Sequence, residues 1–137
     1  MSKSEIEAQA QDSVESFAWQ WTQRTVRDSL RNFHRRLFLD LGITADHFSG
    51  KTVAYFGSGN GRHPWAISQL SRPAKIFSVE LALRSVEYQK VFLKDEVFEI
   101  LQDDICHVNL KADFIYLVGV IQHTADIRAT MENAWQC

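Results

Sequence analysis

The chain has 137 residues, of which 45% are hydrophobic and 23% are charged, and its 15 basic and 17 acidic residues give a net charge of −2. This composition is typical of one globular domain and argues against a disordered or collagen-like chain. The near-neutral charge gives no electrostatic reason to expect a nucleic-acid partner. No apolar run approaches the roughly 20 residues that a membrane span needs, so we expect no membrane partner.

The N-terminal residues, MSKSEIEAQAQDSVE, are polar and acidic, unlike a signal peptide or an Arg-rich transit peptide. We therefore predict a cytoplasmic protein, in which Cys106 and Cys137 are reduced single thiols. These two cysteines have no metal-ligand spacing, so we predict no metal site.

Helical periodicity begins at Thr22. The apolar residues that share one face of this predicted helix are Val26, Leu30, Phe33, Leu37 and Leu41. Arginines on the other faces are either a solvated surface or a contact for an anionic substrate. We expect the preceding aromatic residues Phe17, Trp19 and Trp21 to pack as a plug near the ligand site. Residues 1–50 are predicted to form an N-terminal helical extension, and residues 51–137 the cofactor-binding half of a domain.

From residue 51 onward the chain alternates between strands and helices. Strands are predicted over 52–56, 75–79, 97–101 and 114–118, with helices over 61–71, 82–93 and from about residue 126. Apolar strands that alternate with helices favour a parallel sheet with helices on both faces. The fold class is therefore α/β with a Rossmann-like sheet, and right-handed crossovers bring the ends of its strands to one edge.

A glycine-rich turn follows the first predicted strand. Gly57, Gly59 and Gly61 alternate with Ser58 and Asn60. Glycine allows positive φ and close approach of a ligand, and the N–H groups that open the following helix face the turn. The turn predicts a nucleotide-like ligand. Its spacing differs from the G-x-G-x-x-G of dinucleotide enzymes, which disfavours an NAD-dependent oxidoreductase.

Two acidic residues follow the next two predicted strands. Glu80 ends the second strand, where a carboxylate can accept both hydroxyls of a ribose. Asp104 follows the third strand and suits the exocyclic amine of adenine, with the Ile105 N–H beside it. Asp103 is the alternative for that role. Three ligand-compatible features at successive strand ends predict one binding site.

The segments VAYFGSGNGR, SVEL, LQDDI and FIYLVGVIQHTAD resemble, in order and spacing, the motifs of class I S-adenosylmethionine-dependent methyltransferases. FAWQWT resembles an N-terminal signature of some bacterial small-molecule members. The resemblance implies S-adenosyl-L-methionine as cofactor and a small molecule as methyl acceptor. The residues that it assigns to cofactor binding are Gly57, Ser58, Gly59, Asn60, Gly61, Glu80, Leu81, Asp104, Ile105, Val118 and Gly119.

His123 is the candidate catalytic residue, because it directly follows the fourth strand region. A base is required only if the acceptor must lose a proton. The alternative is a histidine that caps or packs at the strand–helix junction.

The resemblance implies a seven-stranded sheet, of which this chain supplies four strands in the order 3-2-1-4. We therefore expect an incomplete fold, either a truncated chain or a half-domain completed by a partner. Its fourth strand would be an exposed apolar edge, which predicts self-association or partner binding. The alternative function is a non-catalytic, methyltransferase-like binding module that associates through this edge.

Overall fold

The computed structural model describes residues 3–22 and 42–137. Its strands are β1 (Thr52–Phe56), β2 (Lys75–Glu80), β3 (Phe98–Gln102) and β4 (Phe114–Leu117). Its helices are α1 (Lys3–Thr22), α3 (Arg62–Leu70), α4 (Leu83–Phe92) and α5 (Ile127–Gln136), with short 3-10 helices η2 (Ala45–His47) and η3 (Ile121–His123). The predicted strands and helices of the domain are confirmed. The helix predicted after Thr22 lies outside the described residues.

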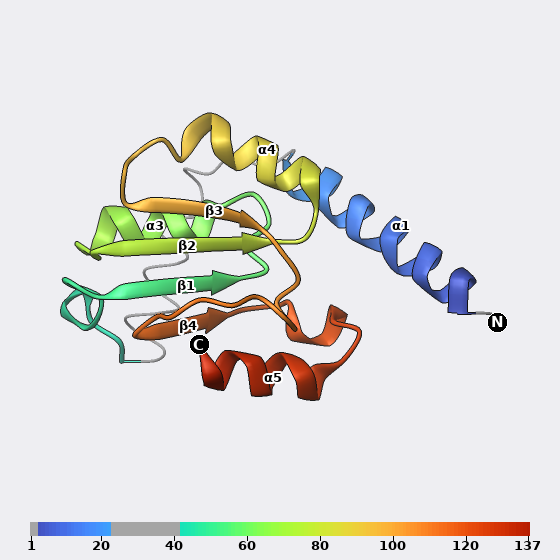
Figure 1. The fold of residues 1–137 in the computed structure, drawn as a ribbon. Helices are drawn as coiled ribbons and strands as arrows, with labels where there is room; N and C mark the ends of the chain where they lie inside the picture. Colours follow the sequence, from blue (N-terminus) through green and yellow to red (C-terminus); the bar gives the residue numbers. More distant parts are fainter. Residues whose placement is uncertain (1–2, 23–41) are drawn as a thin grey trace.

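All four strands are parallel, in the predicted order β3-β2-β1-β4. Phe56, the last residue of β1, pairs with Val79 of β2 and with Leu117 of β4. This register brings the carboxyl ends of the strands to one edge, at the arrowheads in Figure 1. Because the turns that follow these strands meet there, residues far apart in the sequence can share one site.

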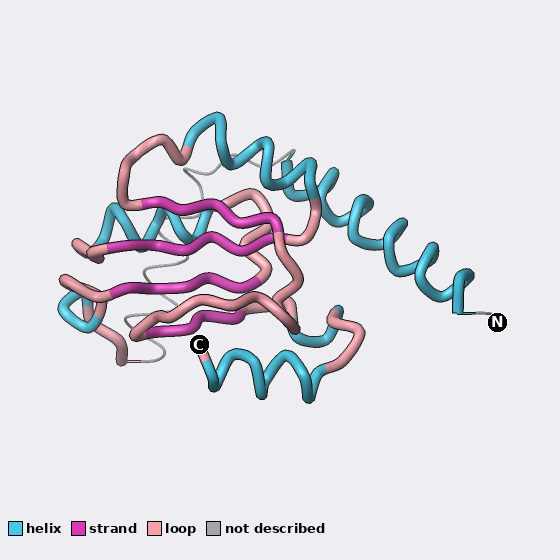
Figure 2. The backbone as a smooth tube through the Cα atoms, viewed as in Figure 1, coloured by secondary structure: helices cyan, strands magenta, loops and turns pink. Residues whose placement is uncertain are grey.

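Helices pack on both faces of the sheet (Figures 1 and 2). On one face, the buried cluster consists of Phe48, Val53, Tyr55, Ala66, Ile67 and Ile76, of which Ala66 and Ile67 belong to α3. On the opposite face, the buried cluster consists of Ala54, Phe56, Val79, Ile105, Val108 and Leu110; the last three belong to the segment 103–113, and Ala134 of α5 packs against the cluster. Residues of β1 alternate between the two clusters, so this strand is buried on both sides, as its uninterrupted apolar sequence predicts.

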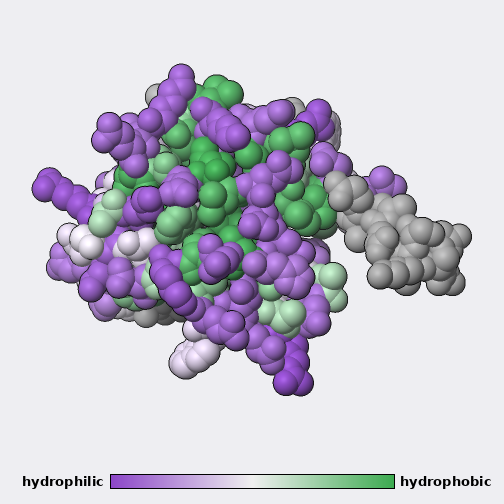
Figure 3. All heavy atoms as spheres, viewed as in Figure 1, coloured by the Kyte–Doolittle hydropathy of each residue, from purple (hydrophilic) through white to green (hydrophobic). Residues whose placement is uncertain are grey.

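Helix α1 contacts α4 and projects away from the sheet at its amino end (Figure 1). The carboxyl end of α1 thus reaches the domain, and the predicted division of the chain at residue 50 stays a prediction. On the face shown in Figure 3, hydrophobic side chains reach the surface over β2 and β3. Within 3–22 and 42–137, no helix is both long enough and apolar enough to cross a membrane.

Candidate ligand-binding site

The glycine turn lies against the end of β2. The N–H groups of Gly57 and Ser58 both donate to the carbonyl oxygen of Val79, over 2.9 and 3.0 Å. Gly57 has a φ of +69°, and a Cβ built on it would lie 2.2 Å from Cγ2 of Val120. Only glycine fits this close approach between the turn and the chain after β4.

A buried glutamine holds the turn to the neighbouring elements. Gln89 of α4 is 0% exposed. Its Oε1 accepts from Ser78 Oγ of β2 (2.5 Å), and its Nε2 donates to Ser58 Oγ (2.9 Å) and to the carbonyl oxygen of Gly59 (2.7 Å). One side chain therefore ties α4, β2 and the glycine turn together, which fixes the turn in one conformation.

Glu80 connects the turn to the start of α4. Its Oε2 accepts from the Gly59 N–H (2.7 Å), and its Oε1 accepts from the Ala82 N–H (3.0 Å). Burial raises the pKa of the Glu80 carboxyl, and the N–H groups of Ala82 and Gly59 oppose that rise. An ionised carboxylate has about four acceptor positions, so both oxygens can accept further hydrogen bonds from a ligand.

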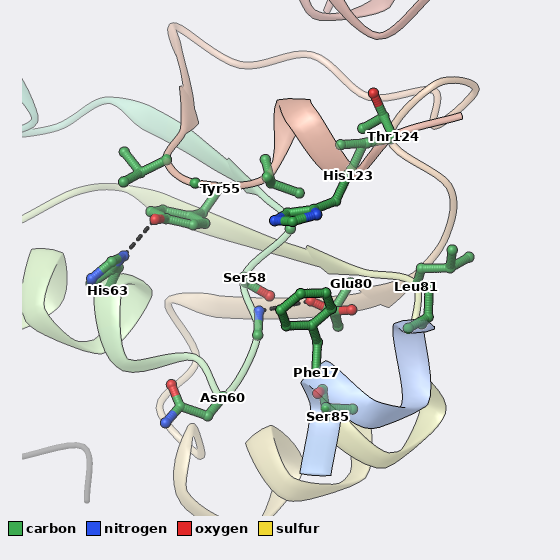
Figure 4. A pocket seen from close by; sticks show the side chains of 18 of the residues that line it. Phe17, Tyr55, Ser58, Asn60, His63, Glu80, Leu81, Ser85, His123 and Thr124 are labelled. Atoms are coloured by element: carbon green, nitrogen blue, oxygen red, sulfur yellow. Dashed lines mark hydrogen bonds between the residues drawn. The ribbon is translucent and has the colours of Figure 1, made fainter. Parts of the chain in front are cut away.

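A cavity of about 480 Å³ opens beside this edge of the sheet. Such a volume is within the usual range of roughly 300–1,000 Å³ for small-molecule sites. The predicted cofactor residues that line it are Gly57, Ser58, Gly59, Asn60, Glu80, Leu81, Asp104, Ile105, Val118 and Gly119. The candidate base His123 lines it as well (Figure 4). The structure thus brings together side chains from four separate stretches of the sequence.

Gly61 is placed differently. It precedes α3 with a φ of +76°, and a Cβ built on it would lie 2.9 Å from Gln89 Cγ and 2.9 Å from Leu93 Cδ1. It faces α4 and does not line the cavity. Its assignment to cofactor binding stays a prediction.

The structure distinguishes between the two aspartates after β3. Asp104 lines the cavity, whereas Asp103 is exposed and does not. Asp104 Oδ1 accepts from the Cys106 N–H (2.8 Å), which closes a local turn and orients the carboxylate. Its backbone carbonyl accepts from the N–H groups of His107 and Val108. This geometry favours Asp104 for the role predicted at the adenine end.

The N-terminal helix reaches the cavity through Phe17. The Phe17 ring packs against His123 with 4.8 Å between ring centroids and a tilt of 51°. Ser13, Val14 and Ala18 also line the cavity from α1. Of the other two aromatic residues, Trp19 is 53% exposed, and the side chain of Trp21 lies outside the described ones. The contact with Phe17 is consistent with a packing role for His123, and both roles proposed for it stay open.

Next to the glycine turn, the cavity has a phenol–imidazole pair that the sequence did not predict. The Tyr55 hydroxyl and His63 Nδ1 form a hydrogen bond (Figure 4). Tyr55 is 1% exposed, and its ring also packs on Tyr116, with 5.0 Å between centroids. Tyr55 and His63 are eight positions apart in the sequence. The only pattern that could have indicated their contact is a polar ring on each side of the glycine turn.

Ser85 of α4 is a further lining residue that the sequence did not reveal. It is 1% exposed, and its Oγ has no hydrogen-bond partner within the described ranges. Buried polar atoms are rarely left unpaired, so an orphaned hydroxyl in a cavity points to a polar ligand. Together with the acceptors on Glu80 and Asp104, it fits a ligand that carries hydroxyl and amino groups, as a nucleoside does.

Comparison with known proteins supports the fold but gives no close relative. No family model matches the sequence, and no curated protein matches it. Solved structures do match. A protein of Methanococcus maripaludis, assigned as an S-adenosyl-L-methionine-dependent methyltransferase, superimposes with a TM-score of 0.69 and 18% identity over 85% of this chain and 55% of its own.

Two further matches have different acceptors in their descriptions. A Pyrococcus horikoshii protein, assigned as an RNA methyltransferase, has a TM-score of 0.61 and 21% identity over 84% of this chain and 59% of its own. Phosphoethanolamine N-methyltransferase 1 of Haemonchus contortus has a TM-score of 0.65 and 14% identity over 90% of this chain and 28% of its own. The chain therefore spans well under two thirds of the length of these proteins.

Proposed function

Since this chain has the fold of class I S-adenosylmethionine-dependent methyltransferases, we propose that it binds S-adenosyl-L-methionine in the cavity and methylates a small molecule. One observation carries the proposal: Glu80, Asp104 and the glycine turn, predicted as ligand contacts from separate motifs, line a single cavity. The structural neighbours support methylation as the general activity, and their acceptors differ.

Three groups of lining residues suit three parts of the cofactor: its ribose, its adenine and its methionine end. Glu80 would accept from the ribose hydroxyls, because its two oxygens keep acceptor capacity beyond the N–H groups of Gly59 and Ala82. Asp104 and the buried Ile105 would hold the adenine. The glycine turn, with Gly57 and Gly59, would surround the methionine end.

The cofactor, when bound, supplies a methyl group on a sulfonium that is already activated. The chain's own contribution is therefore orientation and exclusion of water more than acid–base chemistry. Fixing a donor and an acceptor in line can lower a barrier by up to about 7–11 kcal/mol in favourable intramolecular cases. Phe17 covers one side of the cavity against His123. His123 would take a proton only from an acceptor that must lose one.

A small-molecule acceptor is supported by the site and by the charge of the chain. The cavity of about 480 Å³ matches sites for small ligands. The net charge of −2 offers no general attraction for a nucleic acid. The H. contortus neighbour is described with phosphoethanolamine bound, which shows that the fold accommodates small acceptors.

We also propose a cytoplasmic location. Cys106 and Cys137 are both free cysteines in the structure. Free thiols are stable in a reducing compartment, whereas secreted domains of this size commonly use disulfides.

Calorimetry with S-adenosyl-L-homocysteine tests the cofactor assignment. We expect wild-type protein to bind and Glu80→Ala to bind about 10-fold or more weakly, because hydrogen bonds to a charged group contribute about 1.5–3 kcal/mol. Glu87→Ala is the matched control, since Glu87 is an exposed glutamate of α4. Absence of binding to the wild type at millimolar ligand, with the protein folded, would reject the assignment.

A second candidate function is a binding module, and a specific surface favours it. Strand β4 pairs only with β1 in the described sheet, so it forms an edge. On α5, Ile127, Met131 and Trp135 are spaced by four residues and are 54%, 51% and 91% exposed. Such a stripe on one helix face is typical of an association surface.

Analytical ultracentrifugation discriminates between the two functions in part. If the stripe mediates association, wild-type protein will show a concentration-dependent increase in mass, and Trp135→Ser will reduce it. Val91→Ser is the control, because Val91 is 68% exposed on α4, away from the stripe. A monomer at every concentration would count against association of this chain with itself.

A further inference from the structure

Ser85 has an unusual environment for a serine. Of the buried side-chain nitrogen and oxygen atoms in 3–22 and 42–137, its Oγ is the one without a hydrogen-bond partner. The residue is 1% exposed and lines the cavity. A hydroxyl that is removed from water without a partner costs free energy, so an alanine would serve better if packing were its only role.

Ser85 lies in the first turn of α4, next to the contact between that helix and Glu80. Ala82 is the N-cap of α4, and Ser85 is the third residue of the helix. Helical side chains point back toward the amino end, where the N-cap residue Ala82 has its N–H, although only a long side chain such as Glu bonds that group from this position. That N–H is already bonded to Glu80 Oε1. The Ser85 hydroxyl and the Glu80 carboxylate therefore lie at the same end of the cavity, without a bond between them (Figure 4).

A ligand hydroxyl placed between these two groups would satisfy both. An ionised carboxylate can only accept, whereas a hydroxyl donates one hydrogen bond and accepts others. A ligand O–H that donates to Glu80 keeps lone pairs that can accept from Ser85.

We propose that Ser85 binds the ribose of the cofactor. Its hydroxyl donates a hydrogen bond to one ribose hydroxyl, and that ribose hydroxyl donates a hydrogen bond to Glu80. The inference rests on the proposed function, since it takes the ribose end of the cofactor to lie at Glu80. Ser85 thus adds a hydrogen-bond donor to a ribose site in which Glu80, the predicted contact, can only accept hydrogen bonds. Ser85 thereby distinguishes a ligand that carries the contacted ribose hydroxyl from one that lacks it.

The test compares Ser85→Ala with wild-type protein in titrations of S-adenosyl-L-homocysteine and of its 2′-deoxy and 3′-deoxy analogues. We expect Ser85→Ala to bind the parent compound about 2- to 10-fold more weakly, as expected for one neutral hydrogen bond. It should bind one of the two deoxy analogues as the wild type does. Its melting temperature should be equal or higher, because the lost hydroxyl has no partner in the free protein.

Ser68→Ala is the matched control. Ser68 Oγ donates to the Trp65 carbonyl on α3, and Ser68 does not line the cavity. This variant should leave all three affinities unchanged.

Each other outcome rejects a different part of the account. If the wild type binds the parent compound and Ser85→Ala binds it equally well, the role of Ser85 is rejected while the proposed function stands. If Ser85→Ala loses affinity equally for all three compounds, its contact is not with the ribose. A clear loss of stability in Ser85→Ala would show that the hydroxyl has a structural partner. Absence of binding to the wild type would reject the proposed function and this assignment together.

Discussion

The centre of the sheet and its edge differ in how completely they are packed. In β1, Val53, Ala54 and Phe56 are 0% exposed, and the turn that follows is bonded to β2 and α4. In β4, by contrast, every residue is only partly buried. On α5, Trp135 is 91% exposed. The residues proposed to bind the cofactor depend on the packed centre.

The packed centre gives the proposed cofactor site a rigid frame. Backbone groups fixed by a buried sheet give a rigid site with few alternatives. The Gly59 N–H, the Glu80 carboxylate and the Gln89 amide form one bonded unit with β2. Substitutions at the packed centre should therefore have the larger effects on stability.

Gly57→Ala should destabilise the protein strongly. Both Gly57 and Gly50 have a φ of +69°, but only Gly57 has a neighbour, Val120, within 4 Å of an added Cβ. Gly50→Ala should cost about 1–2 kcal/mol from the backbone conformation alone. Gly57→Ala should cost about 1–3 kcal/mol more from overpacking against Val120. Urea unfolding of both variants measures the difference, and equal losses would contradict the close approach.

Gln89→Leu should have the next largest effect. It leaves Ser58, Ser78 and the Gly59 carbonyl without their shared partner, and each buried unsatisfied group costs about 1–3 kcal/mol. We expect a loss of about 2–4 kcal/mol after relaxation, together with weaker binding of S-adenosyl-L-homocysteine. Gln69→Leu, at an exposed position of α3, should change stability by less than about 0.5 kcal/mol. Chemical denaturation measures both variants, and similar losses of unfolding free energy would show that the Gln89 hydrogen bonds do not stabilise the fold.

Glu80→Gln should change the pH dependence of stability. Because burial raises the folded-state pKa of Glu80, its contribution to stability is fully present below the ordinary value of about 4.3 and is lost as the pH rises through the raised pKa. Relative to Glu80→Gln, the wild type should therefore become less stable as the pH rises from the ordinary pKa of a glutamate through the raised pKa of Glu80. Thermal unfolding across this range measures the effect. If the melting temperatures of the wild type and Glu80→Gln change in parallel with pH, the folded-state pKa of Glu80 is not raised.

Local patterns were sufficient to predict the strands, their order and most of the cavity lining. The apolar run of β1, the glycine turn and the acids at two strand ends are signals within short stretches. Parallel topology then brings them to one edge. Gly61 belongs to the same turn, but the alternation of glycines does not indicate that this residue faces α4.

Residues whose roles depend on contacts between distant elements were not predictable. Gln89 and Ser85 are polar residues within a helix, and such residues are ordinarily solvent-exposed. Their burial becomes evident only when α4 is packed on β2 and beside α1. The approach of Phe17 to His123 likewise depends on where α1 lies. Periodicity gives the faces of each helix, but not the element that each face meets.

The most direct test of the cofactor site is an NMR titration of the ¹⁵N-labelled chain with S-adenosyl-L-homocysteine. The account predicts saturable shifts of the Gly57, Gly59, Ala82 and Ile105 amides, because their residues lie at or beside the cavity edge. Amides at the opposite end of the sheet, such as that of Gly50, should not move. Shifts confined to α5 and the β4 edge, or no shifts at millimolar ligand, would contradict the account.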